Sequence, residues 1–184
     1  MHQIRQAGTT DGAAIAQLHI DSWQAAYRDI LPTAYLDDEI YRERPAAWAK
    51  TLAEEAGKNL VLVAEAERRS QDLVHGAIQG VIAVRLGLND GFDAFLDNLH
   101  VHPTCRGQGL GKILIAAAVR DLMALGLSSL YLWVYDQNAG AIRLYEKLGG
   151  QKGEQGFDDF GGAHAPHTQY CWPDISKLLA ACRE

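Results

Sequence analysis

The sequence predicts an α/β fold in which helices flank a mixed sheet. Two observations carry this prediction: short runs rich in β-branched residues recur along the chain, and the longer segments between them repeat apolar residues at helical spacing. The resulting order of elements is β-α-α-β-β-β-α-β-α-β-β, which is typical of one sheet with helices packed on it. With 184 residues, 48% of them hydrophobic, and no internal repeat or linker, the chain suits a single domain over residues 1–184.

The N-terminal part predicts one strand and two helices. Residues 3–7 form the strand, and the run AAIAQLHIDSWQAAY (13–27) has the apolar face of a helix. Either Thr10 or Asp11 can cap this helix. Pro32 interrupts the pattern, and a second helical region follows it.

The middle of the chain predicts three strands and a helix. The runs at 60–66, 77–84 and 95–101 are strand-like, and the polar stretch 67–76 is expected to be a hairpin connection between the first two. After a glycine-rich turn, apolar residues recur at helical spacing until Gly126, which is suited to end a helix.

The C-terminal part predicts a strand, a helix and two further strands. The run SLYLWVY (129–135) is apolar at nearly every position, as in a strand covered on both faces. A helix follows and ends at Gly149 and Gly150. The remaining residues predict two strands joined by a glycine-rich loop, FDDFGGAHAP, at 157–166.

Charge and composition exclude some partners. The net charge of −6 argues against nucleic-acid or anionic-membrane binding, because both call for a basic surface. No apolar run approaches the ~20 residues of a membrane span, and the N-terminus lacks the apolar core of a secretory signal. Cys105, Cys171 and Cys182 match no metal-ligand spacing, so we expect free thiols in a reducing cytoplasm and no metal.

Residues 105–114 read CRGQGLGKIL, with glycines at three alternate positions where a helix must begin. Glycine costs roughly 1 kcal/mol against Ala inside a helix, so a specific role is expected for these glycines. Backbone N–H groups converge at the start of a helix, and glycines leave them accessible to phosphate oxygens. Arg106 and Lys112 can add charge-assisted contacts. The run therefore predicts a phosphate-binding turn.

Glycine runs before a helix also occur in turns and nucleotide sites of other kinds. A tight strand-to-helix turn that binds no ligand is one alternative. The dinucleotide fingerprint G-x-G-x-x-G follows the first strand of its unit, and both the spacing and the position differ here; a nucleotide-dependent oxidoreductase, which would rest on this run alone, is a second alternative. A P-loop requires Ser or Thr after Gly-Lys, where this chain has Ile113.

Together with its surroundings, the glycine run resembles the acetyl-CoA-binding motif of the GNAT acetyltransferase superfamily. That motif, Q/R-x-x-G-x-G/A, follows a strand of the form L-x-V-x-P; here LHVHP (99–103) precedes RGQGLG (106–111). A second motif of the family, N-x-x-A-x-x-x-Y-x-x-x-G, resembles residues 138–149. The stretch 22–32 resembles the first helix and following turn of many bacterial members.

The resemblance implies a GNAT-like single domain with a mixed, mostly antiparallel sheet of six or seven strands. About four helices would flank the sheet, which would be splayed between its fourth and fifth strands. It also implies acetyl-CoA as the co-substrate. The cofactor-binding residues that it implies are Leu99, His100, Val101, Arg106, Gly107, Gln108, Gly109, Leu110, Gly111, Lys112 and Asn138.

Acetyl transfer to an amine needs a base for the nucleophile and an acid for the departing thiolate. The resemblance assigns the acid to Tyr145, although helical spacing alone would favour a core tyrosine. Many members carry a glutamate early in the fourth strand, where this chain has Phe95. Asp97 on the same strand face is the candidate base, directly or through water, and a surface carboxylate is the alternative. His100 is a second candidate, because an imidazole titrates near neutrality; a metal site with His102 lacks a third ligand.

Aromatic side chains and carboxylates together suit a cationic acceptor. The acceptor-binding candidates are Trp23, Tyr27 and Tyr35 from the first helical region, and Asp158, Asp159 and Phe160 from the later loop. Ordinary packing and a solvated turn account for the same residues equally well. His164 and His167 are expected to shape or cover the site.

The predicted function is an N-acetyltransferase that moves the acetyl group of acetyl-CoA to a small-molecule or peptide amine. Direct attack in a ternary complex is expected, because no cysteine lies in a motif for a covalent intermediate. The resemblance is compatible with a homodimer. The alternative function is a non-catalytic acyl-CoA-binding sensor or partner domain.

Overall fold

The computed structural model describes residues 2–54, 57–66, 77–88, 91–160 and 163–183. One seven-stranded sheet has the strand order β1-β2-β3-β4-β5-β7-β6. Its strands are β1 (His2–Gln6), β2 (Asn59–Ala66), β3 (Ile78–Leu86), β4 (Ala94–Val101), β5 (Leu130–Tyr135), β6 (Gln151–Phe160) and β7 (Ala163–Trp172). Neighbouring strands are antiparallel except β4 and β5, which are parallel. The predicted mixed, mostly antiparallel sheet is confirmed.

Five helices pack on this sheet, one more than the element order predicted. They are α1 (Gly12–Ala26), α2 (Ile40–Ala53), α3 (Leu110–Ala124), α4 (Ala139–Lys147) and α5 (Ile175–Ala181). Short helical segments precede three of them: η1 (Thr9–Asp11), the π-helical η2 (Tyr35–Glu39) and η3 (Pro103–Cys105). The additional helix α5 has a clear start, because the Asp174 carboxylate accepts a hydrogen bond from the Ser176 N–H at 3.0 Å.

The N-cap position of α1 is Asp11, one of the two candidates from the sequence, but its carboxylate makes no capping bond to α1. It accepts from the Gly8 N–H at 2.7 Å and from Arg5, and so it fixes η1 rather than α1 itself. The sequence therefore identified the cap position, but not the groups that the Asp11 carboxylate binds.

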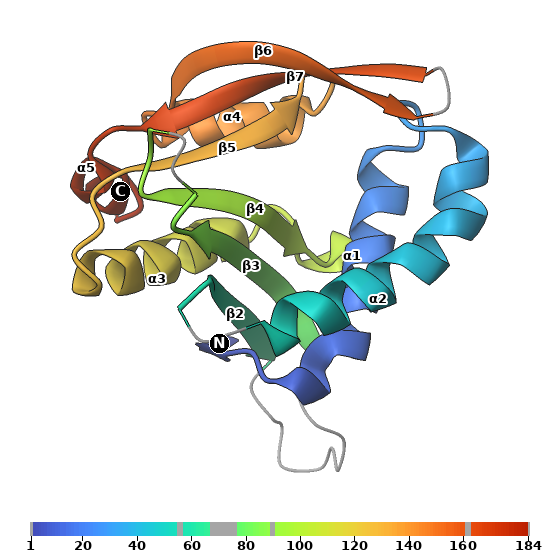
Figure 1. Cartoon of the computed structure of the whole chain (residues 1–184), viewed down its shortest axis with the longest axis horizontal. Helices are drawn as coiled ribbons and strands as arrows, with labels where there is room; N and C mark the ends of the chain where they lie inside the picture. The colour runs from blue at the N-terminus through green and yellow to red at the C-terminus, as the bar shows by residue number, and fades with distance from the viewer. Residues whose placement is uncertain (1, 55–56, 67–76, 89–90, 161–162, 184) are drawn as a thin grey trace.

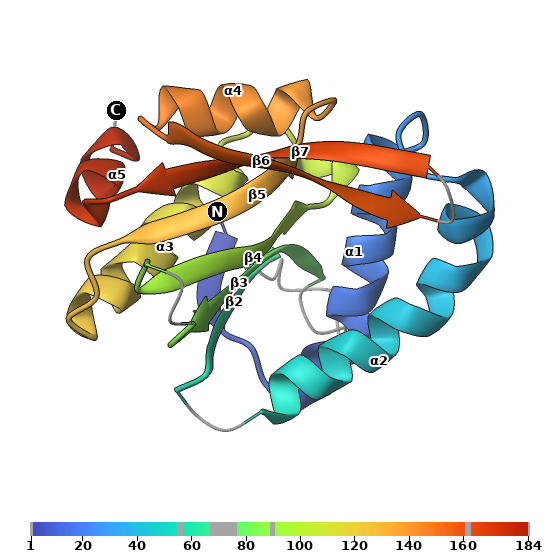
Figure 2. The same ribbon diagram turned by 45° about the horizontal axis from the view of Figure 1, so that its top comes forward.

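Helices cover both faces of the sheet, and the alternation of side chains along each strand divides the core. In β2, Val61 and Val63 join the core formed with α1 and α2, whereas Leu62 and Ala64 join the core formed with α3, α4 and α5. Burial on both faces explains why this run is apolar at successive positions. In Figures 1 and 2, α3 and α4 lie on one side of the sheet and α1 and α2 on the other.

Strands β4 and β5 separate soon after they begin. Their ladder consists of Ala94 with Leu130 and Phe95 with Tyr131, both within the described chain. Beyond these pairs β4 stays with β3, and β5 stays with β7. Figure 1 shows the two strands diverging toward α1. The predicted splay is confirmed, and it leaves one backbone edge of each strand without a neighbouring strand.

The predicted loop at 157–166 is wrong. β6 continues through Phe160 and β7 begins at Ala163, so Asp158 and Asp159 are strand residues and His164 lies in β7. Glycine and proline indicated a loop, but Pro166 lies just beyond the end of the β5–β7 ladder, where its missing N–H removes no bond to β5. The hairpin connection expected at 67–76 lies outside the described residues.

Candidate active site

The glycine turn joins η3 to α3 near the end of β4. Gly107 and Gly109 have φ angles of 75° and 80°, which residues other than glycine rarely adopt. The first hydrogen bond of α3 runs from the Ile113 N–H to the Gly109 carbonyl at 3.0 Å. The N–H groups of the preceding turn thus have no helical partner and lie at the positive end of the helix dipole. The space around both glycines is open, since an added Cβ would meet nothing within 4 Å. An anion has room to approach these N–H groups.

The polar side chains of the turn mostly hold the protein itself. The Arg106 Nη2 donates to the carbonyl oxygen and the Oγ of Ser22 in α1, at 3.0 and 3.1 Å. The Gln108 amide donates to the Thr104 carbonyl at 3.1 Å. The Arg106 side chain therefore binds Ser22, whereas the sequence predicted that it would contact phosphate. The turn offers its backbone N–H groups and the neighbouring Lys112 to an anion.

A cavity of about 460 Å³ lies where β4 and β5 diverge. The predicted site residues that line it are Trp23, Tyr27, Asp97, Leu99, His100, Asn138, Tyr145, Asp158 and His167. The other lining residues are Phe95, Leu96, Asn98, Leu132, Trp133, Val134, Tyr135 and Ala141. The structure thus brings the candidate acid, the candidate bases and part of the predicted acceptor site to one cavity.

Helix α4 carries the candidate acid. Asn138 caps it by accepting from the Ala141 N–H at 3.2 Å, and its amide donates to the Tyr27 hydroxyl at 3.1 Å. Two turns later Tyr145 is buried against the rings of Tyr170 and Trp172, with centroids 6.2 and 6.1 Å away. The Tyr145 hydroxyl makes no hydrogen bond to any residue that the structure describes. Burial raises the pKa of this phenol, so it stays protonated and can donate into the cavity.

A bulge in β4 positions the candidate base. Ala83 pairs with Asn98 and Val84 pairs with Leu96, so Asp97 is the extra residue of the bulge. Its carboxylate accepts from the Arg85 Nε and from the Asn98 amide, both at 3.0 Å. A bulge turns backbone and side-chain groups out of the regular ladder, and here it does so at the cavity wall.

His100 is buried and poorly suited to act as a base. Its ring centroid lies 4.0 Å from that of His19 in α1. Burial, together with the Arg106 and Arg44 guanidinium groups, lowers the pKa of His100 to about 3. Burial also lowers the pKa of His19, whose Nδ1 accepts from the Trp48 indole N–H at 3.1 Å. The expectation that His100 titrates near neutrality is therefore wrong.

The two buried imidazoles predict acid-sensitive stability. Both pKa values are lower in the folded than in the unfolded protein, so the stability they contribute is complete above the unfolded pKa of about 6.5 and is lost as pH falls below it. Each ring is expected to cost about 1 kcal/mol of unfolding free energy per pH unit over that range. Urea unfolding at a series of pH values measures the slope. His19→Asn removes one of the two imidazoles and should reduce this slope by the contribution of one proton. An unchanged slope would show that folding does not lower the pKa of His19.

The predicted acceptor residues are brought to the cavity only in part. Trp23 and Tyr27 line it, whereas the Tyr35 hydroxyl donates to Glu43 at 2.7 Å and its ring joins the core between α1 and α2. Side chains alternate along β6, so Asp158 lines the cavity and Asp159 does not. The side chain of Phe160 lies outside the described residues.

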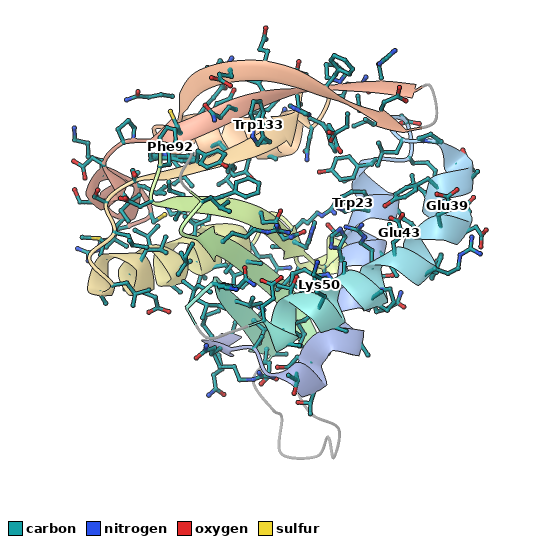
Figure 3. The ribbon with its side chains drawn as sticks, viewed as in Figure 1. Trp23, Glu39, Glu43, Lys50, Phe92 and Trp133 are labelled. Atoms are coloured by element: carbon teal, nitrogen blue, oxygen red, sulfur yellow. The ribbon has the colours of Figure 1, made fainter. Side chains whose placement is uncertain are left out.

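Two aromatic residues of the cavity wall were not predicted. Trp133 and Tyr135 in β5 line the cavity together with Trp23 of α1 and Tyr27 at the C-terminal end of that helix. Figure 3 shows Trp133 on β5 and Trp23 on α1. The Tyr27 and Tyr135 rings meet edge to face, with centroids 5.4 Å apart. Alternation along the strand run 129–135 was the available signal, because it places these aromatic residues on one face.

The splay at the parallel pair and the glycine turn before α3 are the features that the resemblance to GNAT acetyltransferases implied. The model of the acetyltransferase (GNAT) family matches residues 14–150. The chain belongs to this family.

Individual relatives agree with this assignment. The uncharacterized N-acetyltransferase YuaI of Bacillus subtilis (strain 168) is 29% identical over 179 residues, 97% of this chain and 96% of that protein. The ribosomal protein bS18-alanine N-acetyltransferase of Escherichia coli (strain K12) is 42% identical over 57 residues, 31% of this chain and 38% of that protein. The crystal structure of the PaiA N-acetyltransferase from Thermoplasma acidophilum in complex with coenzyme A has a TM-score of 0.72 at 20% identity and covers 91% of this chain and 98% of that one.

The described part of the chain also bears on metal binding and on membrane insertion. No group of three or more His, Cys, Asp or Glu side chains in that part of the chain could hold a metal ion. None of the helices described is long and apolar enough to cross a membrane.

Proposed function

We propose that the protein is an acetyl-CoA-dependent N-acetyltransferase that works by direct attack in a ternary complex. The observation that carries the proposal is the Tyr145 hydroxyl in the cavity between β4 and β5, together with the glycine turn that follows β4 and precedes the first hydrogen bond of α3. Acetyl-CoA combines an anionic diphosphate with a thin extended arm and a reactive thioester. Each of these parts meets a matching feature of this site.

The cofactor-binding residues fit such a ligand. The N–H groups between Arg106 and Gly111 would hold the diphosphate at the N-terminus of α3, assisted by Lys112. The open edge of β4 from Leu99 to Val101 would hydrogen-bond the amides of the pantetheine arm. Asn138, fixed by its two hydrogen bonds, would help to position that arm. The relative whose structure contains coenzyme A has the same fold, which supports this placement.

The chain's own residues can meet the three demands of the reaction. Bound acetyl-CoA supplies the activated acyl group. Asp97, directly or through water, would take the proton of the attacking amine as the N–C bond forms. A main-chain N–H near Leu99 to Val101 would stabilise the charge that develops on the carbonyl oxygen. Tyr145 would donate to the sulfur as the C–S bond breaks, so that the thiolate leaves as a thiol.

Asp97→Asn tests the proposed base. The variant is expected to lower kcat/KM for amines about tenfold, because a positioned base contributes at least that much, and to change the pH dependence of the rate. Release of free thiol from acetyl-CoA measures the rate. Arg85→Gln is the matched control, since it removes the partner of the same carboxylate but keeps the base. Wild-type rates and an unchanged pH profile in Asp97→Asn would show that Asp97 is a structural residue of β4 and not the base.

A panel of amines tests the function as a whole. Wild-type protein is expected to release CoA with some amine acceptors and to bind acetyl-CoA in calorimetry. NADH should not compete with acetyl-CoA for binding, and this result would exclude a nucleotide-dependent oxidoreductase. Tight binding without turnover on a broad panel would support the non-catalytic sensor instead, and failure to bind acetyl-CoA would overturn both.

A further inference from the structure

The cavity wall has an uneven charge. Asp97 and Asp158 line it, and no Lys or Arg is among its described lining residues. Asp97 already has the Arg85 guanidinium as its partner. The remaining carboxylate, Asp158, has no Lys or Arg partner in the part of the chain that the structure describes. The cavity therefore holds a negative charge at the Asp158 end.

The partners of Asp158 fix the position of its carboxylate. The Tyr135 hydroxyl donates to its Oδ2 at 2.8 Å, and the His167 Nδ1 lies 3.7 Å from the same oxygen. Burial and the neighbouring Asp158 carboxylate raise the pKa of Tyr135, so this hydroxyl remains a donor. The second oxygen, Oδ1, accepts no hydrogen bond from the described residues. One oxygen is held by the protein while the other is available to a ligand.

The two residues that contact this carboxylate pack on further aromatic rings of the cavity wall. The His167 ring packs edge to face on Trp133, with centroids 4.7 Å apart, and Tyr135 packs on Tyr27. Ring faces and a carboxylate together attract an ammonium or guanidinium group more strongly than either does alone, because the rings lower the water content around the charge.

The carboxylate lies at a distance from the proposed reaction centre. The Tyr145 ring contacts Tyr170 in β7, and His167, beside Asp158, comes three residues before Tyr170 on the same strand. Three residues of strand span about 10 Å. The nitrogen that attacks the thioester must be uncharged, so a cation at Asp158 is a different group of the same acceptor.

We infer that the acceptor carries a second positive charge, which Asp158 binds through its free oxygen while the reacting amine lies beside Tyr145. The inference rests on the proposed function and names its substrate class: amines with a further cationic group several bonds from the reacting nitrogen. Asp158 is then a specificity-determining residue and takes no part in the chemistry.

Pairs of simple amines test the inference. Linear α,ω-diamines of increasing length are each compared with the n-alkylamine of the same carbon number, by release of thiol from acetyl-CoA. Wild-type protein is expected to prefer the diamine. Asp158→Asn should lower kcat/KM for the best diamine about tenfold, the size of one charge-assisted hydrogen bond, with the alkylamine unchanged. Asp158→Glu, which keeps the charge, should retain part of the preference.

Glu154→Gln is the matched control, because it removes a carboxylate from the same strand without touching the cavity lining. It should leave the preference unchanged. Equal use of diamines and alkylamines by the wild-type protein, or equal losses for both in Asp158→Asn, would overturn the inference and leave the proposed function intact. A protein that acetylates neither series and does not bind acetyl-CoA would overturn both.

Discussion

Replacing Tyr145 by Phe is expected to lower kcat about 100-fold, the effect of removing a positioned proton donor. The ring of Tyr145 is buried against Tyr170 and Trp172, and Phe keeps this packing. Its hydroxyl has no described protein partner, so the substitution leaves no donor or acceptor of the fold unpaired. The whole loss should therefore fall on the chemical step. Thiol release under saturating substrates measures kcat, and calorimetry with acetyl-CoA should give a dissociation constant within a factor of about two of the wild-type value.

Tyr170→Phe provides the comparison for Tyr145→Phe. Its hydroxyl donates to Glu146 at 3.1 Å, outside the lining of the cavity, so it should cost stability and leave kcat nearly unchanged. Normal turnover in Tyr145→Phe would remove this residue as the acid. Loss of acetyl-CoA binding together with kcat would mean that the hydroxyl positions the co-substrate instead.

Gly111→Ala is expected to stabilise the folded chain and to leave acetyl-CoA binding nearly unchanged. An added Cβ would lie 3.8 Å from both Leu144 Cδ2 and Val101 Cγ2, which are ordinary contacts. The fold therefore accepts it, and Ala in place of Gly in a helix contributes about 0.5–1 kcal/mol. The motif that residues 106–111 resemble has Gly or Ala at this position, so the bound co-substrate is expected to accept the methyl group as well. Calorimetry and thermal unfolding measure the affinity and the stability.

Gly126→Ala is the counterpart of Gly111→Ala. Gly126 has a φ angle of 80° at the far end of α3, where a side chain is strained. This variant should lose about 1 kcal/mol of stability and keep its affinity for acetyl-CoA. A large loss of affinity in Gly111→Ala would show that the bound co-substrate leaves no room for a methyl group at this position.

What the sequence predicted correctly depends on local signals. Gly107 and Gly109 adopt positive φ angles that few other residues tolerate. Their positions in the sequence therefore predict a turn from local information alone. The spacing from Asn138 to Tyr145 is equally local, because a cap and a residue two turns later belong to one helix. The mixed, mostly antiparallel sheet and its splay followed from the resemblance that these motifs carry.

What the sequence missed depends on contacts between distant segments. The partner of Arg106 is Ser22, 84 positions earlier, and nothing near Arg106 indicates it. The pKa of His100 is lowered because α1 buries it, which the strand pattern does not reveal. Gly161 and Gly162 indicated a loop that includes Asp158 and Asp159, whereas the strands β6 and β7 extend up to these glycines. The sequence therefore could not show which of the two carboxylates lines the cavity.

The separation of β4 from β5 has a consequence for association between molecules. An unpaired strand edge usually invites another chain to add itself to the sheet, and proteins protect such edges. Here the open edges line the cavity between the two strands, with α1 and α3 packed on β4. A broad, rigid sheet from a second molecule has no access to them, whereas a slender flexible chain does. The fold thus keeps a strand edge ready for hydrogen bonding without the aggregation hazard of an exposed one.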